Sequence, residues 1–160
     1  MVQPIPDGYP RVTPYLICDG ANEAIAFYTS VLGAKERMRM AGPGGKVGHA
    51  ELEIGDSVVM LADEHPEIGA IGPKATGGTP VSLHVYVEDV DSVFERALEA
   101  GATERQPLED KFYGDRSGGF EDPFGHVWHV ASHVEDVSPE EMEKRAAAAM
   151  AAMAAQAQQK

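Results

Sequence analysis

The sequence of 160 residues contains little cysteine, few basic residues and no long apolar segment. Its one cysteine, Cys18, excludes an internal disulfide and a cysteine-based zinc site. No apolar run approaches the ~18 residues that a transmembrane helix needs, so we expect no membrane span. Residues 1–6 have neither a basic region nor an apolar core. We therefore expect no signal peptide and a cytoplasmic location.

Positive charge is also scarce, with 13 Lys and Arg against 26 Asp and Glu and a formal net charge of -13. This balance argues against a nucleic-acid-binding protein, because phosphate contacts need a positive surface. The sequence contains no phosphate-binding loop, no Rossmann glycine fingerprint and no serine nucleophile elbow. A hydrophobic content of 43% excludes an acidic disordered chain and is typical of a globular domain.

The order strand, helix, three strands occurs twice along the chain. The helix ends align at Gly33 and Gly101, an offset of 68 residues (101 minus 33). The pattern predicts an α+β fold of two βαβββ modules, at about 10–64 and 81–134, within one domain over 10–137. The first module has strands at 12–18, 35–40, 47–54 and 57–63 and a helix from 21 to 32. The second has strands at 82–87, 103–106, 116–121 and 126–132 and a helix between Asp89 and Gly101.

A separate helix is predicted over 138–155. Ser138 is placed as its N-cap, Pro139 as its first residue and Glu141 as the end of a capping box. The helix carries an apolar stripe that either packs on the domain, forms a dimer contact or frays, and residues 156–160 are expected to be disordered. The stripe consists of Met142, Ala146, Ala149, Met150 and Met153.

Several local motifs within residues 10–137 resemble those of the vicinal-oxygen-chelate superfamily. This superfamily includes glyoxalase I, extradiol dioxygenases, fosfomycin-resistance proteins and bleomycin-binding (bleomycin-resistance) proteins. The matching segments are 24–28 (AIAFY), 31–34 (VLGA), 85–91 (VYVEDVD) and 121–126 (EDPFGH). Segments 113–116 and 132–137 are similar to a glyoxalase-like subgroup often labelled demethylubiquinone-methyltransferase-like. The resemblance implies two curved mixed sheets around a cavity, a small-molecule ligand and a homodimer.

Strand alternation then predicts which side chains face that cavity. Along 49–54, Ala50, Leu52 and Ile54 should pack on the helix. This leaves His49, Glu51 and Glu53 on the cavity side. An acidic lining favours a cationic or amphipathic ligand. The predicted ligand-binding residues are Tyr15, His49, Glu51, Met60, His84, Tyr86, Arg116, Phe120 and His129.

The family's metal-dependent members place four His, Glu or Gln ligands on the first and last strands of the two modules. The resemblance puts these positions at Thr13, Met60, Ser82 and His129. Only His129 is an ordinary ligand for a divalent metal, so the usual four-ligand site is predicted to be absent. The alternative is a shifted site for zinc, nickel, manganese or iron, made by His49, Glu51, His84 and His129.

Three functions remain open. The first is a small-molecule-binding protein without the usual metal site. The second is a metal-dependent lyase, isomerase or dioxygenase with Glu51 as the proton-transfer base. The third is a structural or regulatory dimer with a vestigial cavity. Arg116 is either an anion clamp for the ligand or a structural partner of Asp115 or Asp122.

Overall fold

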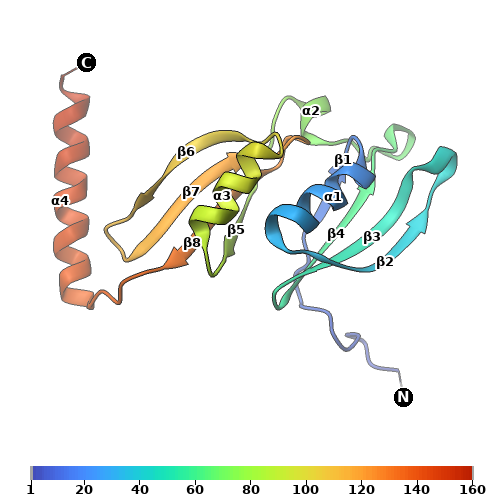
Figure 1. Ribbon diagram of the computed structural model, residues 1–160, viewed down its shortest axis with the longest axis horizontal. Coiled ribbons are helices and arrows are strands. Elements are labelled where there is room, and N and C mark those ends of the chain that lie inside the picture. Colours follow the sequence, from blue (N-terminus) through green and yellow to red (C-terminus); the bar gives the residue numbers. More distant parts are fainter. Residues whose placement is uncertain (1, 160) are drawn as a thin grey trace.

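The computed structural model describes residues 2–159 and has the predicted α+β architecture of two βαβββ modules (Figure 1). The first module contains β1 (Tyr15–Cys18), α1 (Ala21–Leu32), β2 (Lys35–Ala41), β3 (Val47–Ile54) and β4 (Ser57–Asp63). The second contains β5 (Ser82–Tyr86), α3 (Val90–Glu99), β6 (Thr103–Asp110), β7 (Asp115–Glu121) and β8 (Val127–His133). The β2–β3 connection contains a short helical turn at Pro43–Gly45, and the segment between the modules contains another at Pro66–Ile68 and the helix α2 (Pro73–Thr76).

Each module forms one four-stranded sheet, with the order β1-β4-β3-β2 in the first and β5-β8-β7-β6 in the second. The β1–β4 and β5–β8 pairs are parallel and the other pairs are antiparallel. Strand β1 begins at Tyr15 and not at the predicted residue 12, because Pro14 has no amide hydrogen for the ladder. Strand β6 continues past its predicted end at 106, since an edge strand with bulges tolerates Pro107.

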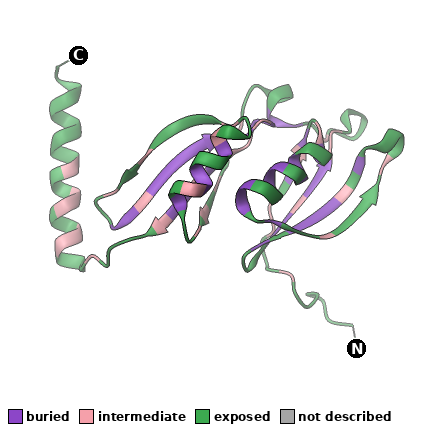
Figure 2. Ribbon diagram, in the orientation of Figure 1, coloured by how far each residue is buried: buried purple, intermediate pink, exposed green. Residues whose placement is uncertain are grey.

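The helices α1 and α3 pack against each other and against one face of each sheet (Figure 1). We call this the helix-covered face, and the opposite face the open face. Both modules contain buried residues (Figure 2), and these form one hydrophobic cluster. Tyr28 of α1 donates a hydrogen bond of 2.6 Å to Asp122 of the second module, and its ring lies 5.2 Å from that of Trp128. The two modules therefore share one core.

The C-terminal helix α4 (Pro139–Ala157) stands apart from the sheets and has no buried residue (Figures 1 and 2). Ser138 caps it by accepting a hydrogen bond of 3.3 Å from the Glu141 amide. The Glu141 carboxylate accepts a hydrogen bond from Arg145 at 3.0 Å. The helix ends at Ala157, two residues later than predicted. Residues 156–160 were expected to be disordered, and residue 160 of that segment lies outside the described part. No helix within residues 2–159 is both long and apolar enough to cross a membrane.

Candidate functional site

The open face of the first sheet carries a chain of hydrogen-bonded side chains. Tyr15 Oη of β1 lies 2.8 Å from Nδ1 of His49 on β3, and His49 Nε2 lies 3.2 Å from Oε1 of Glu51. The N-terminal segment crosses this face, where Tyr9 donates a hydrogen bond of 2.8 Å to Oε2 of Glu51. Arg37 of β2 lies over the Tyr9 ring, 4.6 Å from its centroid, and its Nε is 3.9 Å from Glu51. Four side chains from four segments thus gather around the Glu51 carboxylate, with Tyr15 linked to it through His49.

This environment keeps Glu51 ionised although it is only 4% exposed. Burial alone would raise the pKa of Glu51, but the hydrogen bonds from Tyr9 and His49 and the positive charge of Arg37 lower it overall. Every buried side-chain nitrogen and oxygen within the described residues has a hydrogen-bond partner. Because Glu51 is buried and both of its oxygens are hydrogen-bonded, a ligand cannot reach it. Its hydrogen bond with His49 orients that ring.

A pocket of about 610 Å³ lies next to Tyr15 at one end of this face. Its lining combines the apolar side chains of Ile17, Val47 and Ala62, which we call its floor, with residues of the connecting segments 42–46 and 64–70. The size is within the range of roughly 300–1,000 Å³ that is typical of small-molecule sites. Lys46 contributes a positive charge to the lining.

The three acidic residues in the same lining already have hydrogen-bond partners within the protein. Asp63 accepts hydrogen bonds from the amides of Gly20, Ala21 and Val47, and Glu64 accepts one from Gly72 at 2.8 Å. Glu67 pairs with His65 at 2.9 Å. Among residues 2–159, Lys46 forms no ion pair with a carboxylate within 4.0 Å. The pocket therefore combines apolar side chains with three carboxylates that already have hydrogen-bond partners and one lysine without an ion pair in the described part of the chain.

The open face of the second sheet has a different polar cluster around Asp115, which is 5% exposed. Asp115 accepts hydrogen bonds from Tyr86 at 2.7 Å and from His133 Nδ1 at 2.8 Å. His133 Nε2 lies 2.9 Å from Asp136, so the protonated ring donates to a carboxylate from each of its nitrogens. These bonds, first that with Asp115, raise the pKa of His133. Burial would raise the pKa of Asp115, but the bonds from His133 and Tyr86 lower it.

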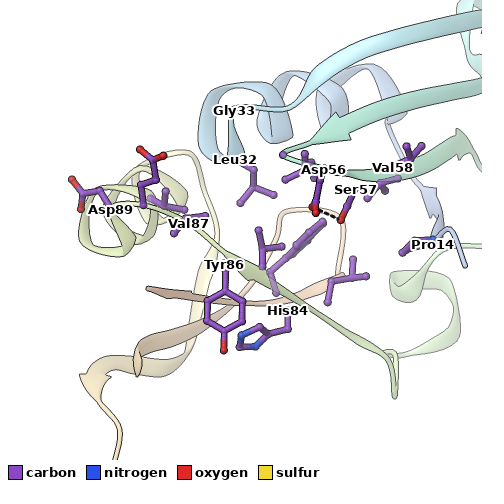
Figure 3. A pocket seen from close by; sticks show the side chains of 18 of the residues that line it. Pro14, Leu32, Gly33, Asp56, Ser57, Val58, His84, Tyr86, Val87 and Asp89 are labelled. Atoms are coloured by element: carbon purple, nitrogen blue, oxygen red, sulfur yellow. Dashed lines mark hydrogen bonds between the residues drawn. The ribbon is translucent and has the colours of Figure 1, made fainter. Parts of the chain in front are cut away.

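A larger groove, of about 950 Å³, lies between the modules at the free edge of β5 (Figure 3). The turn at Asp56 and Ser57 forms one side, and His84 and Tyr86 project from β5 on the other (Figure 3). The groove therefore follows a strand edge, whereas the pocket beside Tyr15 lies on an open sheet face.

The predicted ligand-binding residues fall into three groups. Tyr15, His49, Glu51 and Met60 share the open face of the first sheet, as the register Tyr15–Met60 and Glu51–Met60 requires. His84, Tyr86 and His129 share the open face of the second sheet. Ala50, Leu52 and Ile54 are buried on the helix-covered face, which confirms the predicted alternation of β3.

Arg116 and Phe120 correct the predicted lining. Phe120 pairs with Trp128 in the β7–β8 ladder and is fully buried on the helix-covered face. Arg116 lies on the same face as Phe120 and donates hydrogen bonds to Asp91 of α3 and to Asp110. Arg116 therefore forms structural ion pairs, but with Asp91 and Asp110 and not with the predicted partners Asp115 or Asp122.

The residues at the family's metal positions do not fit a divalent metal. Thr13 lies before β1, Met60 offers a thioether, Ser82 offers a neutral hydroxyl, and only His129 has a suitable donor. Within residues 2–159, no three His, Cys, Asp or Glu side chains are arranged to hold a metal ion. The shifted set divides between the sheets, with His49 and Glu51 on the first and the two histidines on the second.

Tyr9 and Asp115 were missed as site residues. Tyr9 lies in a segment without periodicity, so nothing in the sequence places it on the sheet. For Asp115 the sequence does offer a signal. Strand alternation places it on the same face of β7 as Ser117 and on the opposite face from Arg116.

Comparison with known proteins agrees with this architecture. Residues 10–130 match the family Glyoxalase/Bleomycin resistance protein/Dioxygenase superfamily. The chain therefore belongs to this superfamily, whose fold is that of small-molecule-binding proteins. An uncharacterized protein from Mycobacterium bovis is 44% identical over 84% of this chain and 90% of its own length. An uncharacterized Mycobacterium tuberculosis protein is also 44% identical, over 84% of this chain and 81% of its own.

Solved structures share the fold. Protein PA1353 from Pseudomonas aeruginosa is 27% identical, with a TM-score of 0.63 over 79% of this chain and 99% of that chain. TioX from Micromonospora sp. is 28% identical, with a TM-score of 0.60 over 81% and 100% of the two chains. The fosfomycin resistance protein FosX from Listeria monocytogenes, at 18% identity and a TM-score of 0.60 over 83% and 97%, is similar in fold.

Proposed function

We propose that the chain binds a small amphipathic organic molecule on the open face of the first sheet, without the four-ligand metal site. The observation that carries this proposal is the apolar pocket beside Tyr15. It combines Ile17, Val47 and Ala62 with one hydrogen-bonded tyrosine and one available lysine, which is the usual composition of a small-molecule site.

A thermal-shift screen of uncharged, cationic and anionic aromatic compounds tests this proposal. A ligand at 100 times its Kd adds about 2.7 kcal/mol to the free energy of unfolding. Ala62→Leu extends a side chain into the pocket beside Tyr15 and should abolish the shift. Ser57→Leu makes a comparable addition in the groove between the modules and should leave the shift unchanged. The reverse pattern would transfer the site to that groove.

The metal-dependent alternative has a direct test. After reconstitution with Zn²⁺, Ni²⁺, Mn²⁺ or Fe²⁺, we expect less than one metal ion per chain, because the donors at the family positions are unsuitable. Stoichiometric metal that disappears in His129→Ala would favour the metal-dependent lyase, isomerase or dioxygenase.

We further propose that two copies form a homodimer. Two methionines on the open face of β2 are exposed, Met38 at 38% and Met40 at 55%. A second copy would cover this surface, which is more apolar than a solvated sheet face needs to be. Light scattering should give twice the chain mass of 17.1 kDa. A dimer that binds nothing in the ligand screen would support the structural or regulatory alternative, and a monomer would contradict the proposed assembly.

A further inference from the structure

We propose that Tyr15, His49 and Glu51 form a proton relay that removes the proton from an acidic hydroxyl group, phenolic or enolic, of a ligand in the pocket beside Tyr15. This inference rests on the proposed small-molecule site and adds to it a ligand class and a chemical step. In this relay Glu51 positions His49 and does not itself take the proton from the ligand.

The direction of each hydrogen bond follows from the charge of Glu51. Because Glu51 is ionised, it only accepts hydrogen bonds, so His49 Nε2 must carry the proton of the 3.2 Å contact. In a neutral imidazole the other nitrogen is then unprotonated. His49 Nδ1 therefore accepts the hydrogen bond of 2.8 Å from the Tyr15 hydroxyl. The arrangement is that of a nucleophile–histidine–carboxylate triad, with a phenol in the place of the serine hydroxyl.

Access distinguishes the three members. Tyr15 is 47% exposed and lines the pocket, whereas Glu51 is 4% exposed and lies behind His49 and Tyr9. The Tyr15 ring also packs against the His49 ring, with 5.5 Å between the centroids. Of the three, only Tyr15 lines the pocket, so Tyr15 is the member placed to touch a ligand and Glu51 is a positioning residue.

The step conserves protons and charge. Burial raises the pKa of Tyr15, so the phenol is protonated at neutral pH and is not a preformed base. As the ligand O–H bond breaks, its proton moves to the Tyr15 oxygen, and the proton that Tyr15 carried moves to His49 Nδ1. The products are a ligand oxyanion and a His49 imidazolium whose charge is balanced by Glu51.

The ligand class follows from the pocket. Its apolar floor accommodates an aromatic or unsaturated carbon skeleton, and Lys46 supplies the positive charge that an oxyanion needs. Of the three carboxylates in the lining, Asp63 and Glu64 accept hydrogen bonds from backbone amides, and Glu67 pairs with His65. A hydroxyl with a pKa near that of imidazole is required, because the proton must be shared between ligand and His49.

The test uses 4-nitrophenol, whose ionisation is visible in its absorption spectrum. Bound to the wild-type protein, it should ionise at a pH at least about one unit lower than free probe, which is a tenfold change in its ionisation constant. Tyr15→Phe should bind the probe without this shift, and Glu51→Gln should reduce the shift. Tyr86→Phe is the matched control, because Tyr86 is an exposed tyrosine on the other open face that donates directly to a carboxylate.

A full shift in Tyr15→Phe, or bound probe that ionises like free probe, would overturn the relay and leave the proposed binding function intact. No binding of the probe would overturn the phenol and enol class, and the broader ligand screen tests the binding function separately. Nitrogen NMR of His49 gives a second readout on the unaltered protein. We expect a protonated Nε2 and an unprotonated Nδ1, and the opposite tautomer would refute the relay.

Discussion

Asp122 offers a quantitative test of how the two modules are joined. It is 3% exposed, and each of its oxygens accepts two hydrogen bonds. Oδ1 accepts from the amides of Phe124 at 2.9 Å and His126 at 3.0 Å. Oδ2 accepts from the hydroxyl of Tyr28 at 2.6 Å and from Trp128 Nε1 at 2.9 Å. Since Tyr28 belongs to the first module, this carboxylate connects the two halves of the core.

The substitution Asp122→Asn keeps the shape and removes one acceptor. If the amide oxygen keeps the two backbone bonds, its NH₂ group faces Tyr28 and Trp128. The phenol can rotate to accept a hydrogen bond, but the indole N–H is a donor only and loses its partner. One unsatisfied buried donor costs about 1–3 kcal/mol, and replacing charged by neutral hydrogen bonds adds roughly 1 kcal/mol or more. We expect a total loss of about 3 kcal/mol, a large part of a typical domain stability of about 5–15 kcal/mol.

Urea unfolding followed by fluorescence measures this loss, because the chain has one tryptophan and it contacts Asp122. Tyr28→Phe should cost about 1.5–3 kcal/mol. The double variant should differ from the sum of the two single losses by about 1 kcal/mol, because the residues share one hydrogen bond. A loss below about 0.5 kcal/mol in Asp122→Asn, or strict additivity, would refute the view that this carboxylate joins the modules.

Three further predictions concern single side chains. Burial raises the pKa of the Cys18 thiol to about 12. A thiol reagent at pH 8 should therefore leave the folded protein unlabelled and react only after unfolding in urea. Rapid labelling of the folded protein would contradict the burial of Cys18. Hydrogen bonds with Asp115 and Asp136 raise the pKa of His133 above 6.5, so its stabilisation is present in mildly acidic solution and is lost as the pH rises through the folded-state pKa. The melting temperature of His133→Gln should therefore differ more from the wild type at pH 6 than at pH 9, and an equal difference would count against the ion pair. Gly118→Ala places a Cβ 2.8 Å from the Phe94 ring, so calorimetry should show a loss of about 1–3 kcal/mol, and an unchanged melting temperature would show that the ring moves freely.

The order of elements was predictable because each element has a local signal. Gly33 adopts a positive φ of 66° at the end of α1, and Asp89 caps α3 by accepting a hydrogen bond from Ser92. The alternation of β3 likewise places Glu51 on the open face. The burial of that carboxylate was not predictable, because it depends on Tyr9, 42 residues away in a segment without a regular pattern.

The position of Arg116, in contrast, was available from the sequence and was overlooked. The turn over 122–125 fixes the register of the last hairpin, so Phe120 pairs with Trp128. Trp128 belongs to the face opposite His129, and Phe120 must share that face. Arg116 lies four residues before Phe120 and therefore also points toward α3, where it meets Asp91. Recognition of a ligand anion on the open faces thus cannot use Arg116, and among the residues that line the pocket beside Tyr15, Lys46 is the cation left for that role.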